Sequence, residues 1–372
     1  MKVLTVFGTR PEAIKMAPLV KLLHGSPAIE QKVCSTGQHR EMLEPILNFF
    51  EIKADFELDI MQSGQDLTDI TCRILQGVRS VLQEFRPDWV LVHGDTTTAL
   101  AATLAAFYAG VKVGHVEAGL RTGDLTAPFP EEANRLLVDR LAAAYFAPTQ
   151  RNADNLLLEG IGGHGILITG NTVIDALLWA KEKVQGFSAK VPATIQSAFN
   201  QKARVLLVTG HRRENFGEGF KQICEALLIL ANRFPALNIV YPVHLNPQVY
   251  KPVQEYLSGL KNIFLANPMD YPDFIFAMKK SGLILTDSGG IQEEAPALGK
   301  PVLVMRDTTE RSEGLESGAV QLVGADRERI VAAVEKWWHS STSDEIISPY
   351  GDGKASRRIV AYLVDSAANT GT

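Results

Sequence analysis

The chain has 372 residues, of which 46% are hydrophobic and 21% charged, a composition typical of a globular protein with apolar material for two cores. Its formal net charge of −5 argues against a nucleic-acid-binding protein. Three widely spaced cysteines without a CxxC pair argue against a disulfide framework and a zinc knuckle; with no visible signal peptide, they favour a cytoplasmic protein.

Short apolar runs alternate with amphipathic stretches along the first half of the chain, which predicts alternating strands and helices. We predict strands at residues 3–7, 32–35, 89–93, 111–116, 145–147 and 166–168. We predict helices at residues 11–23, 41–50, 67–85, 97–108, 131–141 and 151–159. The longest uncharged run, residues 96–111, is too short for a membrane span, so we expect a buried helix there.

The second half repeats this alternation, with predicted strands at residues 204–208, 238–241, 263–265, 283–285, 301–305 and 320–323. Such alternation predicts parallel sheets covered on both faces, so we expect an α/β protein with two doubly wound, Rossmann-like domains. We place the boundary after Gly170, which gives a first domain over residues 1–170 and a second over 171–353. A last helix is expected to cross back, so that residues 354–372 join the first domain.

One glycine-rich segment, residues 160–165, matches the pattern GxGxxG but follows a predicted helix and precedes a predicted strand. The dinucleotide-binding fingerprint requires the strand first and the helix afterwards. No GxxxxGK[ST] motif occurs either. The sequence therefore gives no support to NAD or P-loop ATP chemistry.

The segment over residues 283–311 carries the strongest functional signal. A strand, the glycine pair Gly289-Gly290 and a helical pattern follow one another, a geometry that points backbone N–H groups and a helix dipole at an anion. Two adjacent carboxylates on that helix, Glu293 and Glu294, come within reach of a sugar diol, and Arg306 and Arg311 follow as cations for a phosphate. The alternative is a plain turn between strand and helix, but the combination favours a nucleotide site.

The carboxyl ends of the predicted strands carry many ionisable residues, and ligands of open α/β sheets bind at such ends. Arg10 lies in a tight turn after the first strand, which favours an anion site over a solvated helix start. Asp95 and Glu131 could merely cap or begin helices, whereas Glu117 ends an apolar strand and is harder to explain structurally. Three carboxylates near one crevice suit proton transfer at a sugar carbon.

A metal site is the rival interpretation of two of these strand ends. His93 with Asp95, and His115 with Glu117, are spaced so that both side chains of each pair point to one face of a strand. Neither pair has the HxH or HExxH form, so we do not expect a required metal.

The assembled motifs resemble those of the bacterial non-hydrolysing UDP-N-acetylglucosamine 2-epimerases nearly from end to end. The matching segments are FGTRPEAIKMAPLV, QHREML, VLVHGDTTT, VGHVEAGLRTGD, PFPEEANR, GNTVIDALLW, TGHRREN, IVYPVHLNP and LTDSGGIQEEAPALGKPVLVMRDTTER. The resemblance implies a glycosyltransferase-B-like pair of domains with the UDP-sugar in the cleft between them. It also implies interconversion of UDP-GlcNAc and UDP-ManNAc without any cofactor or metal, through elimination of UDP to 2-acetamidoglucal and its re-addition.

The same resemblance assigns roles to individual residues. The implied catalytic residues are Asp95, Glu117, Glu131 and His211, with Asp95 and Glu131 as our preferred acid/base pair and Glu117 assisting. The implied substrate ligands are Arg10, Lys15, Met269, Phe274, Ser288, Gly289, Gly290, Glu294 and Arg311; within this set Met269 and Phe274 hold uracil, Glu294 the ribose, and the other residues the diphosphate. Some relatives carry a regulatory UDP-GlcNAc site, and the residues that match it are Gln38, Arg73, Arg212 and His244.

Relatives are homodimers that supply ManNAc for cell-surface polysaccharide, and we expect the same of this chain. Glu41 stands where regulated relatives often carry glutamine, which argues against regulation. Three alternative functions stay open: a hydrolysing epimerase, a retaining glycosyltransferase of the same fold, and a non-catalytic UDP-sugar sensor. A sensor ought to have lost some of the four catalytic candidates, and all four are present.

Overall fold

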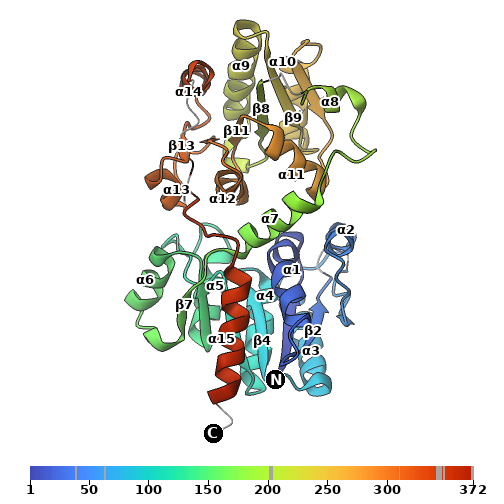
Figure 1. Cartoon of the computed structure of the whole chain (residues 1–372), viewed down its shortest axis with the longest axis vertical. Helices are drawn as coiled ribbons and strands as arrows, with labels where there is room; N and C mark the ends of the chain where they lie inside the picture. Colours follow the sequence, from blue (N-terminus) through green and yellow to red (C-terminus); the bar gives the residue numbers. More distant parts are fainter. Residues whose placement is uncertain are drawn as a thin grey trace. The chain divides into compact units, whose positions relative to one another are not determined.

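The computed structural model describes residues 1–37, 40–62, 64–200, 204–309, 311–340, 346 and 348–369. The chain divides into two compact units (Figure 1). The first unit comprises Met1–Leu178 and Tyr350–Thr372, and the second comprises Trp179–Pro349. Helix α7 (Thr172–Lys183) therefore begins in the first unit and ends in the second.

The first unit is built on a seven-stranded parallel sheet with the strand order β3-β2-β1-β4-β5-β6-β7. Its strands are β1 (Lys2–Phe7), β2 (Glu30–Ser35), β3 (Phe56–Glu57), β4 (Trp89–His93), β5 (Lys112–Val116), β6 (Ala144–Ala147) and β7 (Ile166–Ile168). Its helices, besides α7, are α1 (Arg10–His24), α2 (Arg40–Phe50), α3 (Leu67–Phe85), α4 (Thr97–Tyr108), α5 (Glu131–Leu141), α6 (Gln150–Leu158), the short η1 (Gly163–Gly165) and α15 (Ala355–Asn369).

Alternate residues of these strands pack on opposite faces, as expected for a sheet covered on both sides. Leu4 and Val90 belong to a buried cluster with apolar residues of α3 and α4. On the opposite face, the ring of Tyr362 from α15 lies edge-on to Trp89 and Phe146, with ring centroids 6.4 and 5.5 Å away. The end of the described chain thus packs on the central strands of the first sheet.

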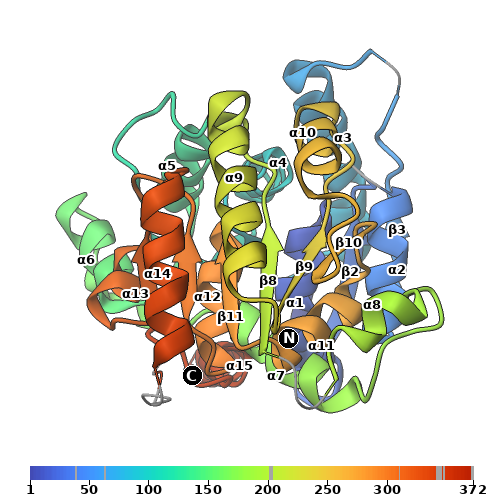
Figure 2. The same ribbon diagram turned by 90° about the horizontal axis from the view of Figure 1, so that it is seen from above.

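The second unit has a six-stranded parallel sheet in the order β10-β9-β8-β11-β12-β13, the same doubly wound arrangement (Figure 2). Its strands are β8 (Arg204–Thr209), β9 (Leu237–Pro242), β10 (Ile263–Ala266), β11 (Leu283–Thr286), β12 (Val302–Val304) and β13 (Val320–Leu322). Its helices are α8 (Ala193–Ser197), η2 (Arg213–Asn215), α9 (Glu218–Arg233), α10 (Pro247–Leu257), α11 (Tyr271–Lys280), α12 (Gly289–Ala297), α13 (Ser312–Glu316) and α14 (Arg327–His339).

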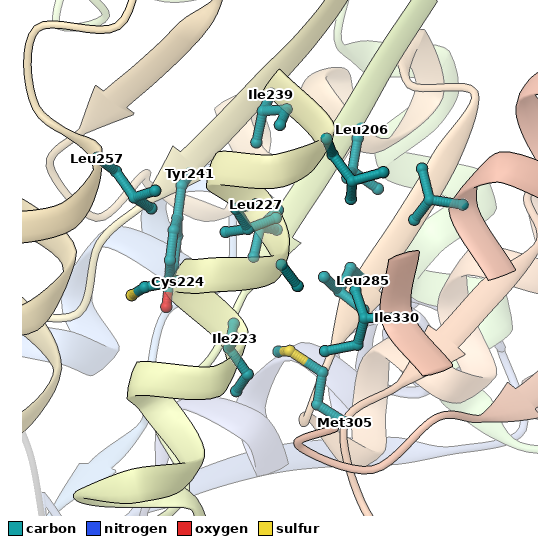
Figure 3. Close-up of a cluster of buried hydrophobic side chains, with 14 of the residues drawn as sticks. Leu206, Ile223, Cys224, Leu227, Ile239, Tyr241, Leu257, Leu285, Met305 and Ile330 are labelled. Carbon is teal, nitrogen blue, oxygen red and sulfur yellow. The ribbon is translucent and has the colours of Figure 1, made fainter. Parts of the chain in front are cut away.

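The core of the second unit lies between one face of this sheet and the helices α9, α10 and α14 (Figure 3). Leu206 and Leu285, from neighbouring strands, meet Leu227 of α9 and Ile330 of α14, and all four are fully buried. Burying side chains of this size stabilises the fold by roughly 1.5–3 kcal/mol each.

The two doubly wound sheets confirm the fold class that the sequence predicts. The apolar run over residues 96–111 forms the buried helix α4. The GxGxxG segment at residues 160–165 lies between α6 and β7, and so follows a helix and precedes a strand, as predicted. The two-residue strand β3 and the short helix α8 were not predicted. The last helix, α15, covers Ala355–Asn369. Among the described residues, no helix is long and apolar enough to cross a membrane.

Candidate functional site

Each sheet has one position where the direction of strand addition reverses, and ligands of open α/β sheets bind beyond the strands at such positions. In the first unit this position lies between β1 and β4, which pair directly. In the second unit it lies between β8 and β11. The strand order therefore directs attention to the segments that follow these four strands.

The turn after β1 needs a glycine at its first position. A Cβ atom on Gly8 would lie only 2.1 Å from Oγ1 of Thr36, so no larger residue fits without displacing its neighbours. The backbone N–H groups of Gly8 and Thr9 donate to Oε2 of Glu12, at 3.1 and 2.8 Å. Arg10, a predicted phosphate ligand, opens α1 directly after this turn and is partly exposed.

Lys15, one turn further along α1, contacts a second predicted site residue. Its Nζ lies 2.7 Å from both carboxylate oxygens of Glu117, and both side chains are largely buried. Nδ2 of Asn171 donates to Oε1 of the same carboxylate at 3.0 Å. Glu117 itself has φ of 68°, a left-handed conformation that costs a non-glycine residue free energy. These contacts hold a strained, charged residue in one orientation.

His93 and His115 are both engaged with protein groups, which bears on the metal interpretation. Nε2 of His93 lies 3.1 Å from Oε2 of Glu117, and burial lowers the pKa of His93 to about 3, so the ring is neutral. Nδ1 of His115 lies 2.6 Å from Oδ1 of Asp139, and its Nε2 lies 2.8 Å from the carbonyl oxygen of Gly94. Both ring nitrogens of His115 are thus occupied by groups other than Glu117, and that pair does not form a chelate. The described residues contain no group of three or more metal-ligating side chains.

Asp95 and Glu132 are joined to one another through a buried arginine on α5, whereas Glu131 is not part of this contact. Nη2 of Arg135 donates to Oδ2 of Asp95 at 2.5 Å, and Nη1 of Arg135 lies 3.0 Å from Glu132. Glu131 is the first residue of α5, as predicted, and its Oε2 is buried without a hydrogen-bond partner in the described part of the chain. The two predicted carboxylates thus have different surroundings. Asp95 is paired with a cation, whereas Glu131 has an oxygen without a partner in the described part of the chain.

In the second unit, the segments after β8 and β11 are tied together by Asp287. Its Oδ2 accepts hydrogen bonds from the backbone N–H groups of His211 and Arg212, at 2.8 and 2.9 Å. Nε of Arg212 donates to the carbonyl oxygen of Asp287 at 3.0 Å. The ring of His244 stacks on that of His211, with centroids 5.7 Å apart. Two predicted regulatory residues, Arg212 and His244, therefore lie beside the predicted catalytic histidine.

Helix α12 begins at Gly289, and Ser288 is its N-cap residue. A Cβ atom on Gly289 would lie 2.7 Å from Nη1 of Arg311, so the absence of a side chain lets that guanidinium reach the helix start. Nε of Arg311 donates to Oε1 of Glu293 at 2.5 Å, which fixes its orientation. A helix N-terminus with an arginine beside it is suited to a phosphate group.

Four other predicted residues lie on or next to the helices α12, α11 and α3. Glu294 is on α12, one residue beyond Glu293, and is 9% exposed. Met269 precedes the N-cap of α11 and Phe274 lies within that helix, both partly buried. Arg73 is on α3 in the first unit, where it donates to Gln62. Gln38 lies outside the described residues.

Three residues that the sequence analysis did not single out bind the predicted ones: Arg135, Asn171 and Asp287. Asn171 and Asp287 closely follow predicted strands, and both lie in segments that match the family motifs. Arg135 also lies in a matching segment, PFPEEANR, but in the middle of a predicted helix and not at a strand end.

The fold and these clusters define a glycosyltransferase-B-like protein of the class that handles nucleotide-sugars. The model of the family described as UDP-N-acetylglucosamine 2-epimerase matches residues 21–364. The chain belongs to this family of isomerases, which confirms the resemblance that the sequence motifs indicate.

Individual relatives agree along the whole length. UDP-N-acetylglucosamine 2-epimerase of Yersinia pestis is 55% identical over 372 residues, which cover 98% of both chains. The crystal structure of UDP-GlcNAc 2-epimerase from Neisseria meningitidis, bound to UDP-GlcNAc, has a TM-score of 0.88 at 50% identity and covers 98% of this chain and 100% of its own. That of Methanocaldococcus jannaschii, in complex with UDP-GlcNAc and UDP, has a TM-score of 0.80 at 34% identity, covering 98% and 99%.

Proposed function

We propose that this chain interconverts UDP-GlcNAc and UDP-ManNAc by eliminating UDP and adding it back. The solved relatives bound to UDP-GlcNAc support the substrate. The observation that carries the mechanism is a set of three carboxylates in the first unit and a helix start suited to phosphate in the second. Asp95 and Glu117 closely follow β4 and β5, and Glu131 begins α5.

The C2 hydrogen of the sugar is not acidic, so its loss must be coupled to departure of the diphosphate. A carboxylate takes the C2 proton, the C1–O bond breaks, and UDP leaves with the electron pair while a C1=C2 double bond forms. A second carboxylate then delivers a proton to the opposite face of C2, and a UDP oxygen adds to C1. Arg10, Arg311 and the amides at the start of α12 would stabilise the charge on the leaving group.

Asp95 and Glu131 are our candidates for the acid/base pair. The guanidinium of Arg135 lies against the carboxylate of Asp95 and fixes its orientation. Glu131 has an oxygen that is buried and unpartnered within the described structure, so this oxygen is available to the substrate. Glu117, which is bound to Lys15 and Asn171, would assist by orientation rather than by exchanging a proton.

Turnover in deuterated water tests this mechanism. Elimination and re-addition should place deuterium at C2 of the product, as read by NMR, and full retention of protium would exclude the elimination. In the same experiment, Glu131→Gln should lower kcat by about 10²–10⁴-fold, the usual contribution of a positioned acid or base. Release of free UDP and ManNAc instead of UDP-ManNAc would identify the hydrolysing alternative.

We further propose that the chain works as a homodimer in the cytoplasm and supplies ManNAc units for surface polysaccharide. Regulation by UDP-GlcNAc is a separate proposal, supported by the position of Arg212 and His244 beside His211. Initial rates from UDP-ManNAc alone should then rise when a trace of UDP-GlcNAc is added. Equal rates in the two assays would rule this regulation out.

A further inference from the structure

Asp287 is a fully buried carboxylate to which the proposed mechanism gives no role. Its contacts join the two segments at the reversal point of the second sheet, since it follows β11 and binds the segment after β8. Ser288, the N-cap of α12, is the next residue in the chain. Asp287 therefore lies between the candidate phosphate site and the loop that carries His211.

The two carboxylate oxygens of Asp287 have different surroundings. Oδ2 accepts from the N–H groups of His211 and Arg212, and the side-chain amide of Asn215 lies 3.4 Å away. Oδ1 is buried and has no hydrogen-bond partner among the residues that the structure describes. Nδ1 of His211 lies 3.5 Å from Oδ1, close enough for a small rotation of the ring to form the bond. An unsatisfied buried carboxylate oxygen is costly, which favours that rotation.

The charged groups around His211 act in opposite directions on its imidazole. Desolvation lowers the pKa of His211, the charge of Asp287 raises it, and His244 and Arg212 lower it, so that the pKa lies below its ordinary value. Without a ligand, the ring is therefore mainly neutral at neutral pH. A second anion placed beside the ring would add to the effect of Asp287 and favour the protonated form.

We propose that Asp287 and the diphosphate of the bound UDP-sugar together draw one proton from solvent onto His211. Nδ1–H then donates to Oδ1 of Asp287, and Nε2–H donates to a phosphate oxygen. The proposal rests on the proposed function, because it takes the diphosphate to lie at the start of α12. Its consequence is that the imidazolium is in place before the C1–O bond breaks, where it offsets the charge that builds up on departing UDP.

Calorimetry measures such a proton directly. UDP-GlcNAc is titrated into the whole chain at pH 7.5 in buffers of different ionisation enthalpy, and the dependence of the heat on the buffer gives the number of protons taken up. Each phosphate of UDP-GlcNAc carries one ester and one anhydride bond, so neither has a proton that titrates near this pH. We expect an uptake that approaches about one proton per site, as linkage requires of a group whose pKa rises through the working pH on binding.

Asp287→Asn is the informative variant, because the amide oxygen can still accept from the loop while its NH2 group meets Nδ1 of His211. The proton uptake should fall to near zero and kcat by about 10²-fold, as expected when a histidine loses its orienting carboxylate or a charge-stabilising donor. The matched control is Asp273→Asn. Asp273 is also a buried carboxylate of the second unit that holds a loop, through the N–H and hydroxyl of Ser188, both at 2.7 Å. This control should lose stability but keep the proton uptake.

Two results would overturn the proposal: no proton uptake by the unmodified chain, or undiminished uptake in Asp287→Asn. If Asp287→Asn does not fold, two other measurements decide. His211→Asn must abolish the proton uptake, and ¹⁵N NMR of the unmodified chain must show His211 as the Nδ1–H tautomer. An Nε2–H tautomer would contradict the pairing of Nδ1 with Asp287. The proton count does not depend on turnover. A chain that binds UDP-GlcNAc with proton uptake but incorporates no deuterium at C2 would refute the proposed mechanism and leave this inference standing, whereas a chain that does not bind UDP-GlcNAc would overturn both.

Discussion

Lys15 and Glu117 form an ion pair whose side chains are only 13% and 9% exposed, and loss of one partner leaves a charge with little access to water. We expect Lys15→Met to lower the free energy of unfolding by about 3 kcal/mol, because an uncompensated buried charge costs that much. Urea unfolding measures the effect. The double variant Lys15→Met with Glu117→Gln should recover part of it.

Lys21→Met is the matched control, since Lys21 lies on the same helix and its pair with Glu51 is more open to water, at 32% and 65% exposed, although its Nζ also donates to the carbonyl oxygen of Phe50. Exposed pairs contribute about 0–1 kcal/mol, so the change should be small. Equal losses of unfolding free energy in the two lysine variants would show that burial of the Lys15–Glu117 pair does not raise the cost of removing one partner.

The buried, neutral ring of His93 makes a prediction about acid stability. Because burial depresses its pKa to about 3, the unfolded chain takes up a proton on this residue at a higher pH than the folded chain does. Its contribution to stability is thus complete above the ordinary pKa of about 6.5 and is lost as the pH falls towards 3. His93→Asn should flatten the decline in unfolding free energy between pH 6 and 4, measured by urea titrations at each pH. An unchanged slope would mean that His93 is protonated in the folded chain.

The start of α15 depends on a carboxylate from another helix. Asp175 of α7 accepts from the backbone N–H groups of Ala355 and Ser356, at 3.2 and 2.8 Å. Free N–H groups at a helix start are costly when buried, so Asp175→Ala should destabilise the first unit by about 1–3 kcal/mol and expose the first turn of α15 to hydrogen exchange. Asp352→Ala removes an exposed pair with Arg358 and a hydrogen bond from the N–H of Lys354, so it should expose that turn less than Asp175→Ala does.

The elements themselves were largely predictable from sequence. Strands such as β4 and helices such as α3 combine an apolar run or a 3.6-residue period with clear end signals, and their predicted bounds match the structure. The strand β3 has two residues and no apolar run of its own, because its pairing with β2 alone defines it. Local patterns do not report a pairing between residues that are distant along the chain.

At the level of the whole molecule, the packing of Tyr362 on the first sheet predicts which unit is destabilised when this contact is lost. Tyr362→Ala removes a partly buried aromatic ring that lies edge-on to Trp89 and Phe146 and should destabilise the first unit by about 0.5–3 kcal/mol, the range usual for single substitutions. Hydrogen exchange read by mass spectrometry should show faster exchange in β4 and β6, with β8 and β11 unchanged. Uniform acceleration in both units would show that they unfold together.

The candidate site was predictable only in part, because local sequence does not report which distant residues lie together. Residue type and position after a strand identified Asp95, Glu117 and the start of α12, since ligands bind at such positions. The partners of these residues were not predictable: Lys15 and Glu117 are separated by 102 positions, and Asp287 and His211 by 76. Only the strand order brings these residues together, and the strand order cannot be derived from local sequence.

The discontinuous first unit has a consequence for synthesis on the ribosome. Helix α15 packs against α1 and the first sheet, yet the whole of Trp179–Pro349 is translated before it. The second unit can therefore complete its own core while the first still lacks a helix and exposes the apolar surface that this helix will cover. Nascent chains stalled just before residue 350 should bind chaperones through the first unit, and release of the last segment should end that binding.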